Sequence, residues 1–182
     1  MNFEIKKSSE EPSEKEVKLE ELRARVEKIT DGLGKGIDEG IKASVVAVMA
    51  HDFPTSGSCE GHLVDEENNR CFLYPSVDIY EPEPEGWKDD DKLKQQWSEA
   101  NALQKVRMQK LLDEFYADKE ADDDYKLVLH PRGIYSAFDL ASVRYGEDDL
   151  NTGEDEVEVL ARARQEMDDF TEFMMKKYQE TE

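Results

Sequence analysis

Apolar residues recur at helical spacing in the first third of the chain. From residue 14 to residue 33 they are three or four positions apart, the repeat of one face of an α-helix; they are Leu19, Leu22, Val26, Ile29 and Leu33. Ser13 followed by Glu16 has the pattern of a capping box, which would start this helix. Glycines after residue 31 end it. A second helix running to about His51 is then predicted by Ile37, Ile41, Val45 and Val48.

The helical period disappears between residues 53 and 80. Proline and glycine interrupt this stretch up to a polar turn at residues 65–69, so we expect a β-hairpin here. In the return arm, Val77 and Ile79 alternate with polar residues, as in a strand with one buried face. Pro75 indicates that this arm is an edge strand or carries a bulge, because proline cannot donate to a sheet ladder.

The rest of the chain alternates helix, strands and helix. A third helix is predicted from about residue 91 to 117, with an apolar face of Leu93, Trp97, Ala100, Leu103, Leu111 and Phe115. Residues 126–130 resemble a strand, and residues 134–143 fit a further one. Asn151 or Thr152 can cap a final helix with an apolar face of Val157, Leu160, Met167, Phe170 and Met174.

This order of elements indicates the α+β class, with a small antiparallel sheet of about four strands and helices packed on it. Helical segments lie toward both ends of the chain. A length of 182 residues fits one domain of ordinary size. We therefore expect a flexible segment at residues 1–12, followed by a single α+β domain at residues 13–180.

Composition restricts the class of partner. Acidic residues outnumber basic ones 45 to 24, which gives a formal net charge of −21. A negative field repels nucleic-acid phosphates, so no nucleic-acid partner is expected, whereas a basic protein partner or a cation is favoured. No stretch approaches the roughly 20 apolar residues that span a bilayer, and the N-terminus lacks the apolar core of a signal peptide. We expect a soluble, cytoplasmic protein with reduced thiols and no membrane partner.

The stretch from Thr55 to His62 concentrates reactive side chains between glycines. Thr55 and Ser58 offer hydroxyl groups, Glu60 a carboxylate, and Gly61 allows a tight turn of the backbone. We interpret the stretch as the wall of a pocket for a small molecule, with Thr55, Ser58, Glu60 and Gly61 as candidate ligand-binding residues. Cys59 and His62 are the candidate catalytic residues. The alternative is a structural turn whose hydroxyl groups satisfy local backbone atoms.

The T-x-x-S-C-x-G-H pattern of this stretch recurs in uncharacterised small proteins and resembles the T-x-x-S-C-S-G-R signature of the Taw3-like family of wybutosine synthesis. Members of that family are S-adenosylmethionine-dependent methyltransferases that act on a modified guanosine of tRNA. The resemblance implies that Ser58, Cys59 and Gly61 line a ligand pocket, with Thr55 in support. It extends only over this motif, and Glu60 and His62 replace the serine and arginine of the family.

Two other kinds of chemistry are open to these residues. Cys59 and His62, joined by His51 and Cys71, could form a Cys2His2 zinc site. Alternatively, Cys59 could act as a thiolate nucleophile with one of the histidines as its base, although the adjacent Glu60 would raise the pKa of the thiol.

Outside the motif, Arg132 is a cation that follows an apolar strand in an acidic chain, so it is a candidate for holding an anionic ligand group. No cofactor is identified by the sequence.

Two functions from different classes remain. The first is a small-ligand or catalytic pocket lined by residues 55–62, which predicts a concave site there. The second is an acidic protein–protein interaction module that meets a basic partner through a continuous negative face. Whether Cys59 and His62 point into one cavity would separate the two hypotheses.

Overall fold

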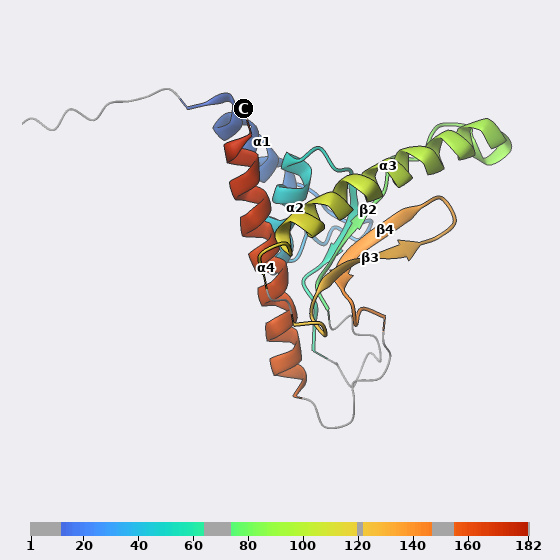
Figure 1. The fold of residues 1–182 in the computed structure, drawn as a ribbon. Helices are drawn as coiled ribbons and strands as arrows, with labels where there is room; N and C mark the ends of the chain where they lie inside the picture. Colours follow the sequence, from blue (N-terminus) through green and yellow to red (C-terminus); the bar gives the residue numbers. More distant parts are fainter. Residues whose placement is uncertain (1–11, 64–73, 120–121, 147–154, 182) are drawn as a thin grey trace, which may run out of the picture.

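The computed structural model describes residues 12–63, 74–119, 122–146 and 155–181. Within these ranges the chain forms four α-helices, two short 3₁₀ helices and four strands (Figure 1). In chain order they are α1 (Glu14–Val26), η1 (Glu39–Ile41), α2 (Lys42–Ala50), β1 (Thr55–Cys59), β2 (Ser76–Ile79), η2 (Trp87–Asp89), α3 (Asp91–Phe115), β3 (Leu127–Arg132), β4 (Ala137–Ser142) and α4 (Glu156–Glu180). The α+β class is confirmed. Residues 1–11 of the expected flexible segment lie outside the described residues.

The four strands form one antiparallel sheet in the order β1-β2-β4-β3. The expected hairpin is present as β1 and β2, while its turn at residues 65–69 lies outside the described residues. The prediction that the return arm is an edge or bulged strand is wrong, because β2 lies between β1 and β4 and Pro75 only precedes it. The pairing of β1 with β2 shifts register between Thr55 and Gly57, so the irregular strand is the edge strand β1.

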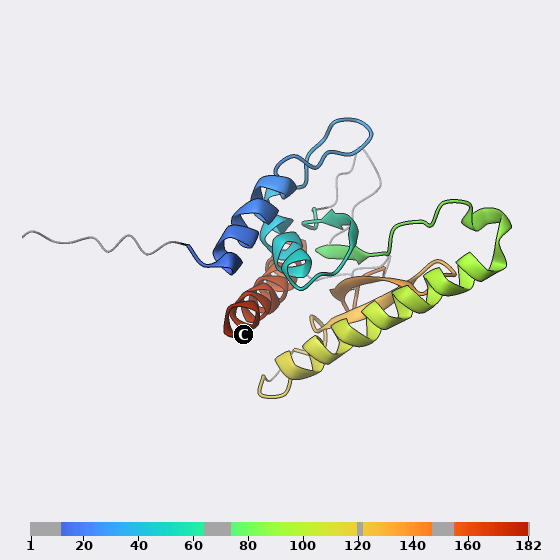
Figure 2. The ribbon, with the colours of Figure 1, turned by 90° about the horizontal axis from the view of Figure 1, so that it is seen from above.

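Helices cover one face of the sheet. α1 packs against α2, α2 against α4, and α3 lies along β3 and β4 (Figures 1 and 2). The sheet side chains that face them are fully buried: Val77, Ile79, Phe138 and Leu140. Burial of one such side chain is worth about 1.5–3 kcal/mol, so this layer is the main source of stability around β2 and β4.

The first helix is shorter than the sequence predicts. The capping box of Ser13 and Glu16 forms, but α1 ends at Val26 and Leu33 is 94% exposed. Beyond the helix, the Asp31 side chain accepts the N–H groups of Leu33 and Lys35, both at 2.8 Å. These local hydrogen bonds compete with the helical ladder, so residues 29–38 form a separate segment rather than a last helical turn.

The second helix begins later than its apolar spacing suggests. Its first turn is the 3₁₀ helix η1, and α2 follows from Lys42 to Ala50 with His51 as its C-cap. α3 nearly matches the expected range, but Leu103 is 60% exposed and is not part of the buried face. Asn101 and Met108 take that place. A residue two positions after Asn101 points to the opposite side of a helix, which explains the difference.

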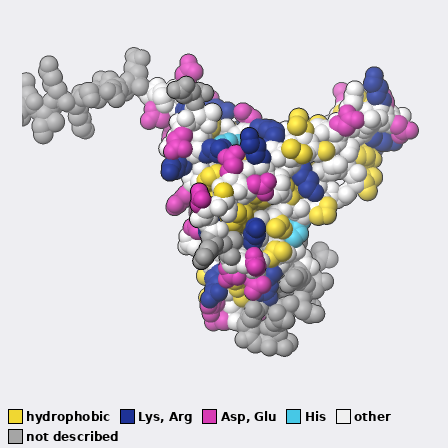
Figure 3. Space-filling model, in the orientation of Figure 1, with side chains coloured by type: hydrophobic (Ala, Val, Ile, Leu, Met, Phe, Trp, Pro, Cys, Tyr) yellow, Lys and Arg dark blue, Asp and Glu magenta, His cyan; other side chains and the backbone are white. Residues whose placement is uncertain are grey.

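The final helix starts at Glu156, and the Asp155 side chain caps it by accepting the N–H of Val157 at 2.9 Å. The expected caps Asn151 and Thr152 lie outside the described residues. Val157 is exposed and does not belong to the buried face, which is formed by Val159, Leu160, Ala163, Met167, Phe170 and Met174. On the face shown in Figure 3, acidic and basic side chains are interspersed.

Candidate functional site

A cavity of about 280 Å³ lies between the edge strand β1 and the segment of residues 29–38. It is lined by Ile29, Thr30, Asp31, Lys35, Gly36, Ile37, Asp38, Val45 and residues 55–58. Ser58 is the cross-strand partner of Val77, so its side chain lies on the helix-covered side of the sheet. Thr55 and Ser58 are thus in the wall of a hollow, whereas Glu60 and Gly61, which were expected to bind a ligand with them, are not among its lining residues. Cys59 and His62 are not among the lining residues.

Gly57 has a specific steric role in β1. A Cβ atom at this position would lie closer to Oδ2 of Asp78 on β2 than nonbonded atoms approach. Glycine therefore lets the two strands pair while Asp78 stays in place. Gly57 and Cys59 lie toward the side of Asp78 and Ser76, whereas Ser58 faces the helices. The motif is divided between two faces of one strand.

Three side chains that can bind a metal converge just beyond the end of β1. Single donor atoms of Asp38, Cys59 and His62 all lie within 4.8 Å of one another. Oδ2 of Asp38 is 3.2 Å from Nε2 of His62, and Oδ1 of Asp38 is 3.0 Å from Nζ of Lys35. Asp38 also lines the cavity, so it connects the hollow with the cluster. The sequence analysis missed Asp38, because no pattern in a glycine-rich segment marks one aspartate among many.

The turn that carries Cys59 and His62 is held from both sides. From α4, the Arg164 side chain donates hydrogen bonds to the carbonyl oxygens of Glu60 and Gly61, at 2.9 and 2.8 Å. On the other side, the Glu60 carboxylate accepts the N–H of Gly40 at 2.8 Å. Gly61 has φ +75°, a left-handed conformation that glycine adopts without strain. Glu60 is therefore a structural anchor of the turn.

The electrostatic surroundings do not favour a thiolate at Cys59. Burial raises the pKa of the Cys59 thiol, against the opposing hydrogen bond from the Gly61 N–H, and the Asp38 and Glu60 carboxylates raise it further. At Asp38, partial burial opposes ionisation, but Lys35 and His62 outweigh it and lower the pKa of the carboxyl group. Cys59 is a free thiol, and the raised pKa weakens the nucleophile hypothesis because the thiolate is the reactive form.

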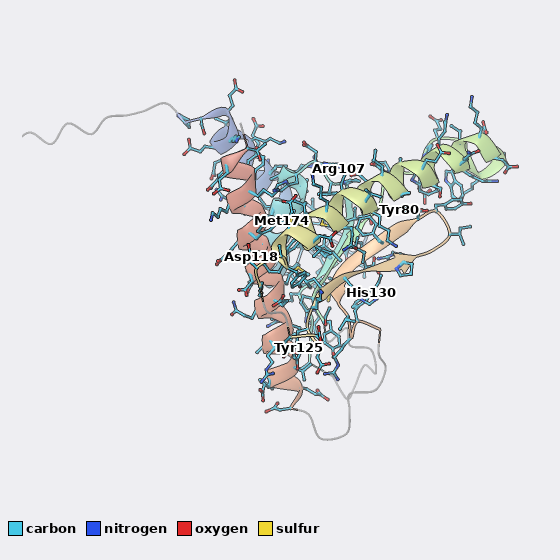
Figure 4. The ribbon with its side chains drawn as sticks, in the orientation of Figure 1. Tyr80, Arg107, Asp118, Tyr125, His130 and Met174 are labelled. Atoms are coloured by element: carbon cyan, nitrogen blue, oxygen red, sulfur yellow. The ribbon has the colours of Figure 1, made fainter. Side chains whose placement is uncertain are left out.

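The other histidines lie away from this cluster. His51 caps α2, and its Nε2 is 2.8 Å from the carbonyl oxygen of Met174. Met174 lies on α4 and is labelled in Figure 4. His130 is on β3, at the sheet edge opposite β1, and contacts the carbonyl oxygen of Ser142 at 2.7 Å. The structure does not bring His51 together with Cys59 and His62 as the predicted Cys2His2 set requires. Cys71, its fourth member, lies outside the described residues.

Arg132 is occupied by protein carboxylates. Its guanidinium pairs with Asp78 and with Asp139, the latter at 3.1 Å. Burial and the neighbouring Asp139 raise the pKa of Asp78, against the opposing effect of Arg132. Because both acceptors are internal, Arg132 neutralises a carboxylate pair on the sheet, and the anionic-ligand role predicted for it gains no support.

Comparison with protein-family models, curated proteins and solved structures gave no match for this chain. The resemblance to the wybutosine-synthesis family therefore stays a prediction. Among the described helices, none is long and apolar enough to cross a membrane.

Proposed function

We propose that this protein binds a small polar molecule in the cavity between β1 and residues 29–38. One observation carries the proposal: the unusual Thr55–Ser58 stretch forms a wall of this hollow, and Lys35 and Asp38 line it together with that stretch. Hydroxyl, ammonium and carboxylate groups converging on a partly apolar concavity are the usual composition of a ligand site.

The lining also defines the class of ligand. A volume of about 280 Å³ is small for a binding site, which favours a metabolite of few heavy atoms over a nucleotide cofactor. Asp31 and Asp38 outnumber Lys35 among the charged lining residues, so a neutral or cationic ligand is preferred over an anion. Ile29, Ile37 and Val45 provide the apolar part of the wall.

The tRNA methyltransferase activity implied by the sequence resemblance is less well supported. Glu60 stands where that family has serine, and here its carboxylate anchors the turn on Gly40. A net charge of −21 also opposes a tRNA partner. For the acidic interaction module, the one face drawn in Figure 3 carries interspersed charges rather than a continuous negative surface.

The test is a thermal-shift screen of the full chain against small amines, amino acids, sugars and nucleosides, followed by calorimetry of any hit. Thr55→Val removes the hydroxyl group from the wall while keeping the branched shape, and it should weaken binding at least about fivefold. Thr181→Val, at the exposed end of α4, is the matched control and should bind as the wild type does. Equal weakening by both variants, or full binding by Thr55→Val, would refute the proposed site.

A further inference from the structure

We infer that Asp38, Cys59 and His62 form a binding site for a divalent transition metal, with Zn²⁺ as the best fit. This set differs from the one that sequence spacing suggests, because it replaces His51 and Cys71 with an aspartate from the segment before η1. It does not depend on the proposed ligand pocket, although the two share Asp38.

The donor set matches the metal in type and charge. A sulfur, an imidazole nitrogen and a carboxylate oxygen together select Zn²⁺ over Mg²⁺ or Ca²⁺, which prefer oxygen alone. Cysteine and aspartate bind metal as anions, so their two negative charges balance one divalent cation. Among the described residues this is the one cluster with such a composition.

The separations need only a small adjustment. Bonds of about 2.0–2.3 Å in a tetrahedral zinc site place the ligand atoms about 3.3–3.8 Å apart. Here the donor atoms lie within 4.8 Å of one another, and Asp38 and His62 are already at 3.2 Å. The metal would replace their hydrogen bond. Lys35 contacts Oδ1, the other carboxylate oxygen of Asp38, so it can stay in place as metal binds Oδ2.

Hydrogen bonds already fix the turn that joins the two proposed ligands Cys59 and His62. The N–H of Gly61 lies 3.4 Å from Sγ of Cys59, in a position to donate to the sulfur. Such an outer contact orients a metal-bound thiolate, and the hydrogen bonds from Arg164 fix the same turn from α4. Metal can enter from solvent, because the His62 side chain is 44% exposed.

Three protein ligands leave a fourth coordination position open. Water or a ligand group can take this position, and Asp38 places the site beside the cavity that it also lines. An open position is the arrangement of reactive zinc centres rather than of closed structural ones. A metal held there would act as a Lewis acid toward a group bound at the open position.

The experiment is a titration of chelator-treated full-length protein with Co²⁺, followed by displacement with Zn²⁺. We expect one equivalent of Co²⁺ to bind, with the intense near-ultraviolet band of a cobalt–thiolate bond. Cys59→Ser should abolish that band. Asp38→Asn and His62→Gln keep similar shapes and should weaken binding by about tenfold or more. Circular dichroism and melting curves of each variant establish that it is folded.

Cys71→Ser and His51→Asn are the matched controls, because they change the other cysteine and a distant histidine. Both should keep the cobalt spectrum and its affinity. The inference is overturned if folded wild-type protein shows no thiolate band, or if either control loses the band as Cys59→Ser does. Thr55→Val should bind Co²⁺ normally, so a failed small-molecule screen and a failed metal titration are separate results.

Discussion

Asp78 occupies the space where a side chain at Gly57 would begin, because its Oδ2 lies against the position of a Cβ atom at residue 57. The same carboxylate pairs with Arg132 across the sheet. A residue in the motif strand β1 is thereby coupled to charges on β2 and β3. Little space is therefore left for a side chain at residue 57 while Asp78 keeps its position.

Gly57→Ala should therefore destabilise the protein by about 1–3 kcal/mol, because the added methyl group must displace Asp78 or move β1. Urea denaturation measures the change. Gly32→Ala is the control, since no atom lies within 4 Å of its added Cβ. In the Gly57→Ala/Asp78→Ala double variant the clash is absent, so its loss should be smaller than the sum of the single losses. If the two losses of stability simply add, the side chain of Asp78 is not what excludes a methyl group at residue 57.

Asp78→Asn should change how stability depends on pH. The pKa of Asp78 is raised in the folded protein, first by burial and then by Asp139. In the unfolded chain the carboxyl group of Asp78 has a pKa of about 3.9, so on raising the pH the unfolded chain loses the carboxyl proton before the folded protein does. The contribution of Asp78 to the free energy of unfolding is therefore present below about pH 3.9 and is lost as the pH rises through the pKa of the folded state.

Asparagine does not titrate, so Asp78→Asn lacks this loss, and its stability relative to the wild type should increase with pH from about 4 upward. Unfolding curves at several pH values provide the measurement, and slopes are compared because the variant also loses an ion pair with Arg132. Asp123→Asn, an exposed position, should keep the wild-type slope. A wild-type slope in Asp78→Asn as well would contradict the assignment.

Arg164→Met should loosen the turn of residues 59–62 and cost about 1 kcal/mol. It removes two charge-assisted hydrogen bonds, whose value is reduced because the side chain is 42% exposed. Arg162→Met is the control on the same helix, since the contacts of Arg162 within the described part of the chain are with the side chains of Glu158, Asp122 and Tyr125 rather than with the turn. Hydrogen exchange should accelerate at Gly61 in the first variant and stay unchanged in the second. Equal changes in stability and exchange in both variants would show that the hydrogen bonds of Arg164 do not specifically hold the turn.

Leu22→Ala should lower the thermal midpoint clearly, with a loss of about 1–3 kcal/mol, because Leu22 packs against the main core from α1. Leu103→Ala should cost less than about 0.5 kcal/mol, because that side chain is 60% exposed on α3. Differential scanning calorimetry compares the two. An unchanged midpoint in Leu22→Ala would mean that this face of α1 is not packed.

Local patterns determined the type and approximate place of most elements. The capping box at Ser13, the apolar spacing in α2, α3 and α4, and the alternation around Val77 and Ile79 all depend on neighbours within a few residues. For this reason the α+β class could be predicted from the sequence. The same patterns extended α1 too far and assigned Leu103 to the core, since spacing does not reveal which side of a helix meets a partner.

Sequence also identified residues 55–62 as unusual, because their composition alone is distinctive. Only the tertiary structure divided that motif between a cavity wall at Thr55 and Ser58 and a cluster at Cys59 and His62. It added Asp38 and Arg164, which are separated from the motif by long stretches of chain, and it placed His51 elsewhere. Such groupings arise from the packing of α2, α4 and β1, and contacts between distant segments leave no periodic trace along the chain.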